Sequence, residues 1–443
     1  MLLIAAVMSF ALWRWQLRRE INGRLAAIHA KGLPTNWAEM AIWPTTVADS
    51  ENAAFIYTNA IAQMVPDGIT DNYRFKLPSR GQLLSDATRA QINGAIQTNH
   101  FALATVYSAV KQRNSRYPVN YMEGPGAKVP HLAGLKRIAT LLECDAISKA
   151  DAGDAVGTAE AISASFSAAQ SLEGEPLLLS QLTGNSLLGM SCQSLERALG
   201  RIPLTDEWLA KLSAQIIGSE TTNRMLTGLI GDRALYNEFL RLAQDDVRQM
   251  VSIANRSASE GEKTDMPSRN PGIGWKFLGF WERDRNFFLR GMETNILIAS
   301  IGPPASMSLT NETQKLESQA MNGYYFFSSL VLPGISHTAK GDAYSHANLR
   351  VALVALAIER WRGIHQDEIP DSLDLLVPSF LPSIPVDPYD GKPLRFKRLA
   401  RGYVVYSVGP NLQDDAGKEK PPHSAKVPRD QLDRYDITFT VER

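Results

Sequence analysis

The feature that most constrains this chain is a proline-rich turn near its C-terminal end, Ile384 to Leu394 (IPVDPYDGKPL). Its three prolines lack a backbone donor, and each disfavours helix at the residue before it. The Asp390-Gly391 pair inside the run is typical of a tight turn. The chain therefore changes direction here, so that one regular element must end before the run and another must begin after it.

The segments on either side of this turn predict a helix packed on a small sheet. Ala343 to Trp361 contains neither Pro nor Gly and repeats apolar residues at helical spacing. After the turn, Leu394 to Lys397 and Tyr403 to Val408 favour strands joined by a short hairpin. The last segment, Asp436 to Val441, alternates polar and apolar residues as a half-buried strand does. Residues 341–443 are therefore predicted to form an α+β module with three antiparallel strands.

This order of features resembles the C-terminal module of the major pseudopilin of bacterial type II secretion systems. The segments that carry the resemblance are, in order, AIERWRG, SLDLLVP, IPVDPYDGKPLRF, YVVYSVGPNLQDDAG and a terminal DI strand. The prepilin-peptidase motif of pseudopilins, a Gly followed by Phe-Thr-Leu-Ile-Glu, does not stand at Met1. The resemblance thus implies the fold of the module and not the pseudopilin function. The whole chain is similar to uncharacterised bacterial membrane-anchored helical proteins that end in this module.

The first residues, Met1 to Trp13 (MLLIAAVMSFALW), are apolar throughout and predict a membrane anchor. As a helix they span about 20 Å against about 30 Å of hydrocarbon, and extension to Leu17 nearly closes the gap. No basic stretch precedes them and no small-residue cleavage site follows, which favours an uncleaved single-pass anchor over a signal peptide. The alternative is a helix docked on the protein's own core. Residues 1–31 are predicted to be the anchor and its extension.

The side of the membrane on which the body lies is open to two interpretations. Basic residues follow the apolar run with only Glu20 opposing them, which by the positive-inside rule places the body in the cytoplasm. These residues are Arg14, Arg18, Arg19, Arg24 and Lys31. The pseudopilin resemblance implies the opposite side. We expect the soluble part on the extracytoplasmic side of the cell membrane.

Charge and cysteine content exclude several classes of function. The chain has 443 residues with 46 basic and 46 acidic side chains, so its net charge is zero and it lacks the positive field of nucleic-acid-binding proteins. Cys144 and Cys192 are its two cysteines, too few for a zinc cluster or a disulfide framework. They are predicted to be buried free thiols, with a single disulfide in an oxidising envelope as the alternative.

Helical periodicity predicts an all-helical body at 35–255, a polar linker at 256–274 and a second helical segment at 275–340. The helix, Gly153-Asp154 turn and Ala-rich helix resemble one tetratricopeptide-like hairpin, but no second copy follows. The predicted fold class is therefore mainly α, an irregular multi-helix body with a solenoid-like stack as the alternative, followed by the C-terminal module. The predicted helix caps are Asn36 with Glu39, Ser50, Asp154 and Thr205.

Aromatic residues gather in the second helical segment. They are interpreted as core because they recur at helical spacing, with a membrane-facing or partner-facing surface as the alternative. The residues are Phe277, Phe280, Trp281, Phe287, Phe288, Tyr324, Tyr325, Phe326 and Phe327.

Enzyme motifs are missing from the sequence: it contains no dinucleotide-binding loop, nucleophile elbow, phosphate-binding loop or HExxH. The best catalytic candidate is the trio His337, Asp342 and His346, where the last two share a helix face and suit a metal or a general base. The alternative interpretation is a helix-capping Asp with solvated imidazoles. Glu359, Arg360 and Arg362 are predicted to form ion pairs that cover the sheet module.

The loop between the second and third predicted strands is the candidate metal site. Calcium takes six to eight oxygen ligands with flexible geometry, which matches the loop's density of carboxylates beside glycines. In the module that it resembles, the corresponding loop holds calcium, which implies ligands near Asn411 and near Asp433 and Asp436. The full candidate set is Asn411, Asp414, Asp415, Asp433 and Asp436. The alternative is a solvated acidic loop.

Taken together, these features predict a membrane-anchored, non-enzymatic envelope protein that acts as a scaffold or binding component of a secretion or pilus-like assembly. Its expected partners are the membrane, through the N-terminal helix, and a protein, with calcium as cofactor and no nucleic acid. The alternative is a hydrolase with its site around His337, Asp342 and His346.

Overall fold

The computed structural model describes residues 1–44, 47–71, 77, 80, 82–112, 114–221, 223–245, 278–323, 325–336, 338–421 and 434–443. Across this part of the chain the structure is mainly helical, with a small antiparallel sheet near the C-terminus, which confirms the predicted fold class. The predicted linker, 256–274, lies outside the described residues.

The element bounds are as follows. The first helices are α1 (Leu2–Ala30), α2 (Trp37–Ile42), α3 (Ala53–Gln63), α4 (Asp86–Thr98), α5 (His100–Ala109), α6 (Pro130–Asp151), α7 (Ala155–Gln170) and α8 (Leu178–Leu199). The later ones are α9 (Asp206–Thr221), α10 (Arg224–Asp245), α13 (Phe280–Ile301), α14 (Thr310–Asn322), α15 (Phe326–Ser336) and α16 (Thr338–Ile364). The strands are β1 (Arg395–Arg398), β2 (Tyr403–Ser407) and β3 (Ile437–Val441), and the short 3-10 turns are η1 (Asp49–Glu51), η2 (Tyr121–Gly126), η3 (Ala305–Leu309) and η4 (Leu373–Leu376).

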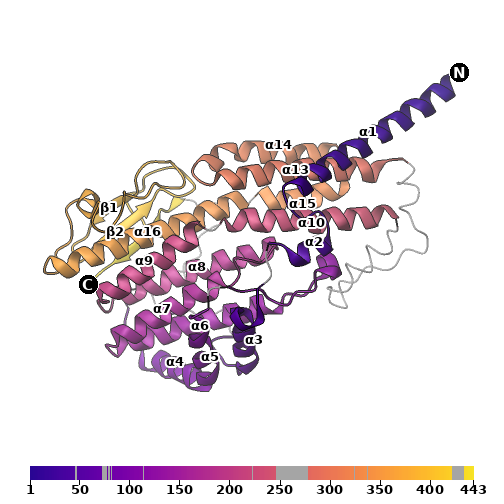
Figure 1. Ribbon diagram of the computed structural model, residues 1–443. Helices are drawn as coiled ribbons and strands as arrows, with labels where there is room; N and C mark the ends of the chain where they lie inside the picture. The colour runs from indigo at the N-terminus through magenta and orange to yellow at the C-terminus, as the bar shows by residue number, and fades with distance from the viewer. Residues whose placement is uncertain are drawn as a thin grey trace.

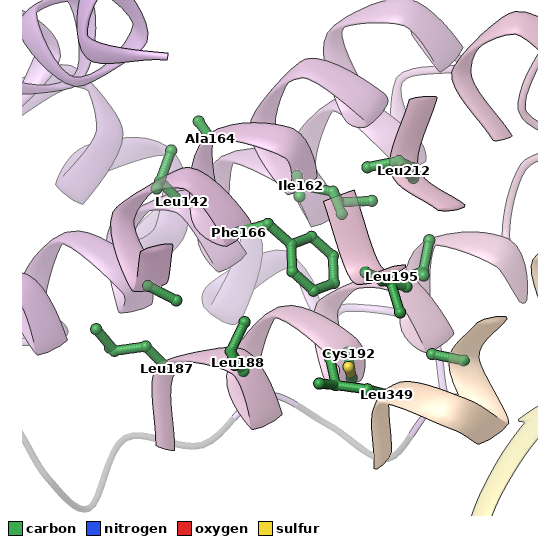
Figure 2. Close-up of a cluster of buried hydrophobic side chains, with 14 of the residues drawn as sticks. Leu142, Ile162, Ala164, Phe166, Leu187, Leu188, Cys192, Leu195, Leu212 and Leu349 are labelled. Carbon is green, nitrogen blue, oxygen red and sulfur yellow. The ribbon is translucent and has the colours of Figure 1, made fainter. Parts of the chain in front are cut away.

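The larger hydrophobic core joins the helical body to the C-terminal sheet. It runs through α3, α5, α6, α7, α8, α9 and α16 and continues into side chains of β2 and β3. Phe166 of α7 is fully buried, and Figure 2 shows it surrounded by side chains that include Leu195 of α8 and Leu212 of α9. Small residues on α7 let its neighbours approach closely. The sheet therefore packs on the same core as the helices before it.

A second core forms a separate layer from α2, α10, α13, α14, α15 and the C-terminal half of α1. This layer meets the first where α10 crosses the start of α8. A Cβ at Gly231 would lie 1.7 Å from the carbonyl oxygen of Pro176, so only glycine permits this approach. Gly228, one turn earlier, lies against Leu178 in the same way. Both glycines thus lie inside one continuous helix, at a contact between the two layers.

Three of the four predicted helix caps are present, and the fourth is wrong. The side chains of Asn36, Asp154 and Thr205 accept hydrogen bonds from the backbone N–H three residues on. Ser50 lies instead in η1, and α3 is capped by Asn52, whose side chain also accepts from the Arg116 backbone N–H at 2.9 Å. The hydrogen bond between Asn52 and Arg116, which are distant in the sequence, therefore helps to set where α3 begins. The local sequence pattern does not show this contact.

The C-terminal sheet has the order β1-β2-β3, with Arg395 opposite Tyr406 and Tyr403 opposite Val441. The predicted strand segments match the observed ones to within a residue or two at each end. The predicted polar face of the last strand is partly wrong, because Thr440 is buried. Glu196 of α8 covers it and accepts a hydrogen bond from its backbone N–H at 2.6 Å. An edge strand is thereby closed by a helix side chain.

The N-terminal half of α1 projects from the helical body, at the end of the molecule opposite the sheet (Figure 1). Every residue from Met1 to Trp13 is exposed, whereas Leu17, Ile21 and Ile28 further along the same helix are buried. The described helices include none whose length and apolar character suffice to cross a membrane.

Candidate functional site

Asp387 organises the proline-rich turn on which the acidic loop rests. Its carboxylate is completely buried. One oxygen accepts from the Tyr389 N–H at 2.9 Å and the Ser407 hydroxyl at 2.8 Å, and the other accepts from the Val408 N–H at 2.9 Å and the Arg395 guanidinium at 3.1 Å. The carboxylate therefore ties the turn to the end of β2. Asp387 was not predicted as a site residue, although an Asp between two prolines is a usable signal in the sequence.

Arg395 of β1 extends this arrangement toward the acidic loop. Besides Asp387 it donates to Asp390 in the turn and to Asp414 in the loop, where Nε lies 3.1 Å from Oδ2. Burial alone would raise the pKa of Asp390, but the hydrogen bond and the charge of Arg395 lower it overall. Three aspartates thus share one guanidinium, and Asp414 already has a cationic partner within the protein.

Asp436 draws the acidic loop back onto the start of β3. Its carboxylate accepts from the Gly417 N–H at 2.7 Å and the Asp415 N–H at 3.4 Å. Asp415 in turn accepts from the side-chain amide of Asn411 at 3.0 Å. Burial, together with the neighbouring charges of Asp415 and Asp414, raises the pKa of Asp436 although its backbone hydrogen bonds oppose this. The structure therefore brings four of the predicted ligands into one loop cluster.

Calcium binding by this cluster stays a prediction. Asp433, the fifth candidate, lies outside the described residues. Among the residues that the structure describes, no group of three or more His, Cys, Asp or Glu side chains is arranged to hold a metal ion. The oxygens of Asp436 face backbone N–H groups, and one oxygen of Asp414 faces Arg395. A cation would have to be shared among oxygens that already accept hydrogen bonds.

His346 and Asp342, the described part of the histidine trio, lie in a network of polar and charged side chains. His337 lies outside the described residues. His346 Nε2 lies 3.8 Å from Asp342, and its Nδ1 lies 3.7 Å from Glu220 of α9, distances that are too long for hydrogen bonds. Glu220 also binds Arg350, which donates to the Val386 carbonyl at 2.6 Å. The network fastens α9 and α16 to the proline-rich turn.

The carboxyl groups on either side of His346 differ in their pKa. Burial raises the pKa of Asp342, against the attraction of His346 and Arg350. Burial also acts to raise the pKa of Glu220, but the contributions of His346 and Arg350 outweigh it and lower the pKa. A hollow on the α3–α5 surface is lined by none of these residues. It has a volume of about 590 Å³ and is lined by Gln63, Phe101, Ala104, Thr105 and Ser108, none of which titrates.

A buried His131–Glu175 pair was missed by sequence analysis. Nε2 of His131 lies 2.8 Å from Oε1 of Glu175, and both side chains are buried. The imidazole stacks on Tyr117 at 4.1 Å between ring centres, and the Tyr117 hydroxyl bonds to Ser171 at 2.8 Å. This pair joins the start of α6 to the turn before α8. The two residues are 44 positions apart in the chain and lack any local pattern that would signal their contact.

The predictions for the cysteines are confirmed, and those for the aromatic residues are confirmed in part. Cys144 and Cys192 are buried free thiols, as predicted, and burial raises the pKa of both. Of the aromatics, Trp281, Phe287, Phe288 and Phe327 are core as predicted. The prediction is wrong for Phe280 and Phe326, which are exposed because they stand at the starts of α13 and α15. Phe277 and Tyr324 lie outside the described residues.

Charged side chains fix the second half of α1 to α13. Arg14 and Arg18 both bind Glu282, Arg24 binds Glu293, and Asn286 donates to Glu20 at 2.7 Å. The Trp13 ring lies directly against Gly279, where an added Cβ would come within 2.9 Å of it. The helix is therefore held firmly up to Trp13, and the apolar residues before it extend beyond these contacts.

No known protein family, curated protein or solved structure matches this chain. Functional inference therefore rests on its own residues.

Proposed function

We propose that this protein is a membrane-anchored, non-enzymatic envelope protein whose helical body and C-terminal module form a scaffold for a protein partner. The observation that carries the proposal is the projecting half of α1, in which every residue from Met1 to Trp13 is exposed. Consecutive exposed apolar residues cover all sides of a helix. A helix that is apolar on all sides fits hydrocarbon better than a one-sided protein groove.

The division of α1 into two halves supports the same proposal. The second half makes two kinds of contact. Ile21 enters the second core and Leu25 packs against it, while Arg14 and Arg24 pair with α13. The first half adds nothing to that core. Removing such a surface from water stabilises by about 25 cal/mol per Å² of apolar area, so a lipid environment is strongly favoured over solvent.

The body suits a scaffold because its charged side chains form ion pairs that connect separate elements of the fold. Arg395 links three aspartates around the proline-rich turn, and Arg350 links Glu220 to that turn. Such networks hold elements in fixed relative positions. The pseudopilin-like module, with a secretion or pilus-like assembly as its setting, is part of this proposal, as is calcium in its acidic loop.

We place the body on the extracytoplasmic side. The basic residues after the apolar run favour the cytoplasm by the positive-inside rule. Three of them, Arg14, Arg18 and Arg24, have partners on α13, which gives them a structural role independent of topology. A membrane-impermeant maleimide applied to intact cells tests this, with Phe101→Cys as the exposed target because both native thiols are buried. Labelling is expected without lysis; labelling only after lysis would place the body in the cytoplasm.

The anchor is tested by sequential extraction of membranes from cells that express the full chain. High salt weakens charge-based attachment, whereas detergent removes proteins held by apolar contact. We expect the protein to stay in the pellet at high salt and to be released by detergent. Release by salt alone would contradict an apolar anchor.

The hydrolase alternative makes a different prediction at the histidine network. His346→Gln and Asp342→Asn would abolish an activity centred there and would change stability only through lost ion pairs. In the scaffold proposal, both variants keep membrane attachment and partner binding, measured by crosslinking in intact membranes. Loss of a hydrolytic activity in either variant, with the melting temperature unchanged, would favour the hydrolase.

A further inference from the structure

Three helix ends meet where α1 leaves the body. At the start of α13, Gly279 lies against the ring of Trp13 on α1. The end of α14 and the start of α15 reach the same place, because Arg283 donates to the Gly323 carbonyl at 3.1 Å and Asp284 accepts from the Phe327 N–H at 2.7 Å. In Figure 1 this is the end of the second layer from which α1 projects.

These helix ends carry large apolar side chains on the surface. Leu278 is 55% exposed, Phe280 45%, Met321 67% and Phe326 55%. We call these four residues the docking rim. Single exposed apolar residues are ordinary on protein surfaces, whereas a cluster of them marks a binding surface.

No polar spacer on α1 separates its apolar run from the body, and this fixes the position of the docking rim relative to the membrane. The apolar run continues to Trp13, and the ring of Trp13 already touches the body at Gly279. Gly279 lies between Leu278 and Phe280 in the chain. When lipid surrounds the apolar run, these rim residues are therefore brought to the depth of Trp13, which is the boundary between hydrocarbon and headgroups.

The side chains that follow Trp13 suit that boundary. Trp15 is 58% exposed, and the Arg19 guanidinium lies 5.3 Å from the centre of its ring. Arg18 is also exposed. Tryptophan is enriched at the membrane–water interface, and exposed arginines are attracted to anionic headgroups.

We infer that the docking rim rests in the headgroup region of the membrane, so that the body lies against the bilayer on the α13–α15 end and does not stand off from it. The ligand is a lipid surface that contains anionic headgroups. This inference rests on the proposed function, because it takes the apolar half of α1 to be in the same bilayer.

Depth-dependent fluorescence quenching tests the inference on the full chain. Single cysteines are introduced as Leu3→Cys in the apolar run, as Met321→Cys or Phe326→Cys in the docking rim, and as Phe101→Cys on α5 for the control. Cys144 and Cys192 are buried, so a fluorophore attaches selectively to the new thiol. Each labelled protein is reconstituted into phosphatidylcholine–phosphatidylglycerol vesicles whose lipids carry a nitroxide at the headgroup or along the acyl chain.

We expect acyl-chain nitroxide to quench the label at position 3 most strongly, and headgroup nitroxide to quench both rim labels several-fold more than the label at position 101. Two rim positions are used so that the result does not depend on one substitution. Rim labels that are quenched no more than position 101, with position 3 still quenched, would overturn the docking rim and leave the anchor intact. Rim labels shielded from water and from lipid alike would show a protein–protein contact and would also overturn it. No quenching at position 3 would overturn the anchor itself.

Discussion

The hydroxyl of Tyr403 on β2 donates a hydrogen bond to the Glu359 carboxylate on α16 across a distance of 2.9 Å, and both side chains are buried. The same carboxylate accepts from Arg362 at 3.0 Å and pairs with Arg443 at the end of the chain. Burial and the charge of Glu359 raise the pKa of Tyr403 well above its usual value. This contact fixes the sheet on the helix. The predicted ion pairs are confirmed for Glu359 and Arg362, whereas Arg360 pairs with Asp206 of α9.

Two substitutions at this contact are expected to differ in their effect on the free energy of unfolding, because one removes a hydrogen bond and the other removes the carboxylate that neutralises a buried charge. Tyr403→Phe should lower the free energy of unfolding by about 1 kcal/mol. Glu359→Ala should lower it by about 3 to 5 kcal/mol, because the buried Arg362 guanidinium would lose its buried partner and keep only the exposed carboxylate of Asp367. Urea denaturation of the full chain measures both. Arg360→Ala, which removes a more exposed pair with Asp206, is the control and should cost less than about 1 kcal/mol. Equal costs for Glu359→Ala and Arg360→Ala would contradict this account.

Asp387 is expected to be the most sensitive residue of the proline-rich turn. Asp387→Ala leaves the Ser407 hydroxyl and the Val408 N–H without their acceptor and should lower the free energy of unfolding by about 3 to 5 kcal/mol. The matched control is Asp371→Ala, whose exposed carboxylate pairs with Arg398. Chemical denaturation compares the two. A control variant as unstable as Asp387→Ala would show that the buried acceptor is not what holds the turn.

Stability should fall as pH rises from about 5 to about 8. Burial raises the pKa of Asp232 from 3.8 to about 7, opposed by a hydrogen bond from the Leu178 N–H. A raised pKa means that folding favours the protonated carboxyl, so its stabilisation is complete below the unfolded pKa and is lost as pH passes the folded one. Burial of Glu196 also raises its pKa to about 7 and acts in the same direction.

Asp232→Asn tests this pH dependence because it keeps an acceptor for Leu178 and cannot ionise. The variant should reduce the loss of unfolding free energy between about pH 5 and about pH 8 by on the order of 2 kcal/mol. Urea denaturation at both pH values gives the difference. An unchanged slope would mean that Asp232 does not titrate in this range.

Calcium is expected to raise the melting temperature of the full chain relative to chelator, because a ligand that binds only the folded state stabilises it. Asp415→Asn should remove that shift: it deletes one charge from the cluster while leaving the Asp436 bonds to the backbone in place. Its melting temperature in chelator should match that of the parent protein. A parent protein that melts identically in calcium and chelator would exclude the site.

Local pattern predicted the elements well where they lie within one continuous stretch. The α16 pattern, the strands around Ala400-Arg401-Gly402 and the Asp154 cap depend on neighbours within a few residues, and the structure places them as expected. The start of α3 was missed because Asn52 is fixed by Arg116, more than sixty residues away. Burial of Thr440 was missed for the same reason, since Glu196 on α8 covers it.

The candidate site was predictable in part. The acidic loop was visible as a composition, and its Asp414, Asp415 and Asp436 gather as expected. The competition from Arg395 was not visible, because strand register decides which carboxylates it meets. Asp387 and Glu175 lie in turns, and His131 lies at the start of α6; their contacts form only when distant elements pack. Long-range packing, which no local pattern encodes, decides all three.

The most direct test of the membrane anchor is a chain that lacks residues 2–12. This deletion keeps Trp13 and every ion pair between α1 and α13. Flotation with phosphatidylcholine–phosphatidylglycerol vesicles and a thermal melt are measured on the deleted and full chains. We predict that the melting temperature is unchanged while the deleted chain loses its flotation with vesicles. Equal flotation of the two chains would contradict the anchor, and a lowered melting temperature with flotation retained would show that the apolar half of α1 serves the fold instead.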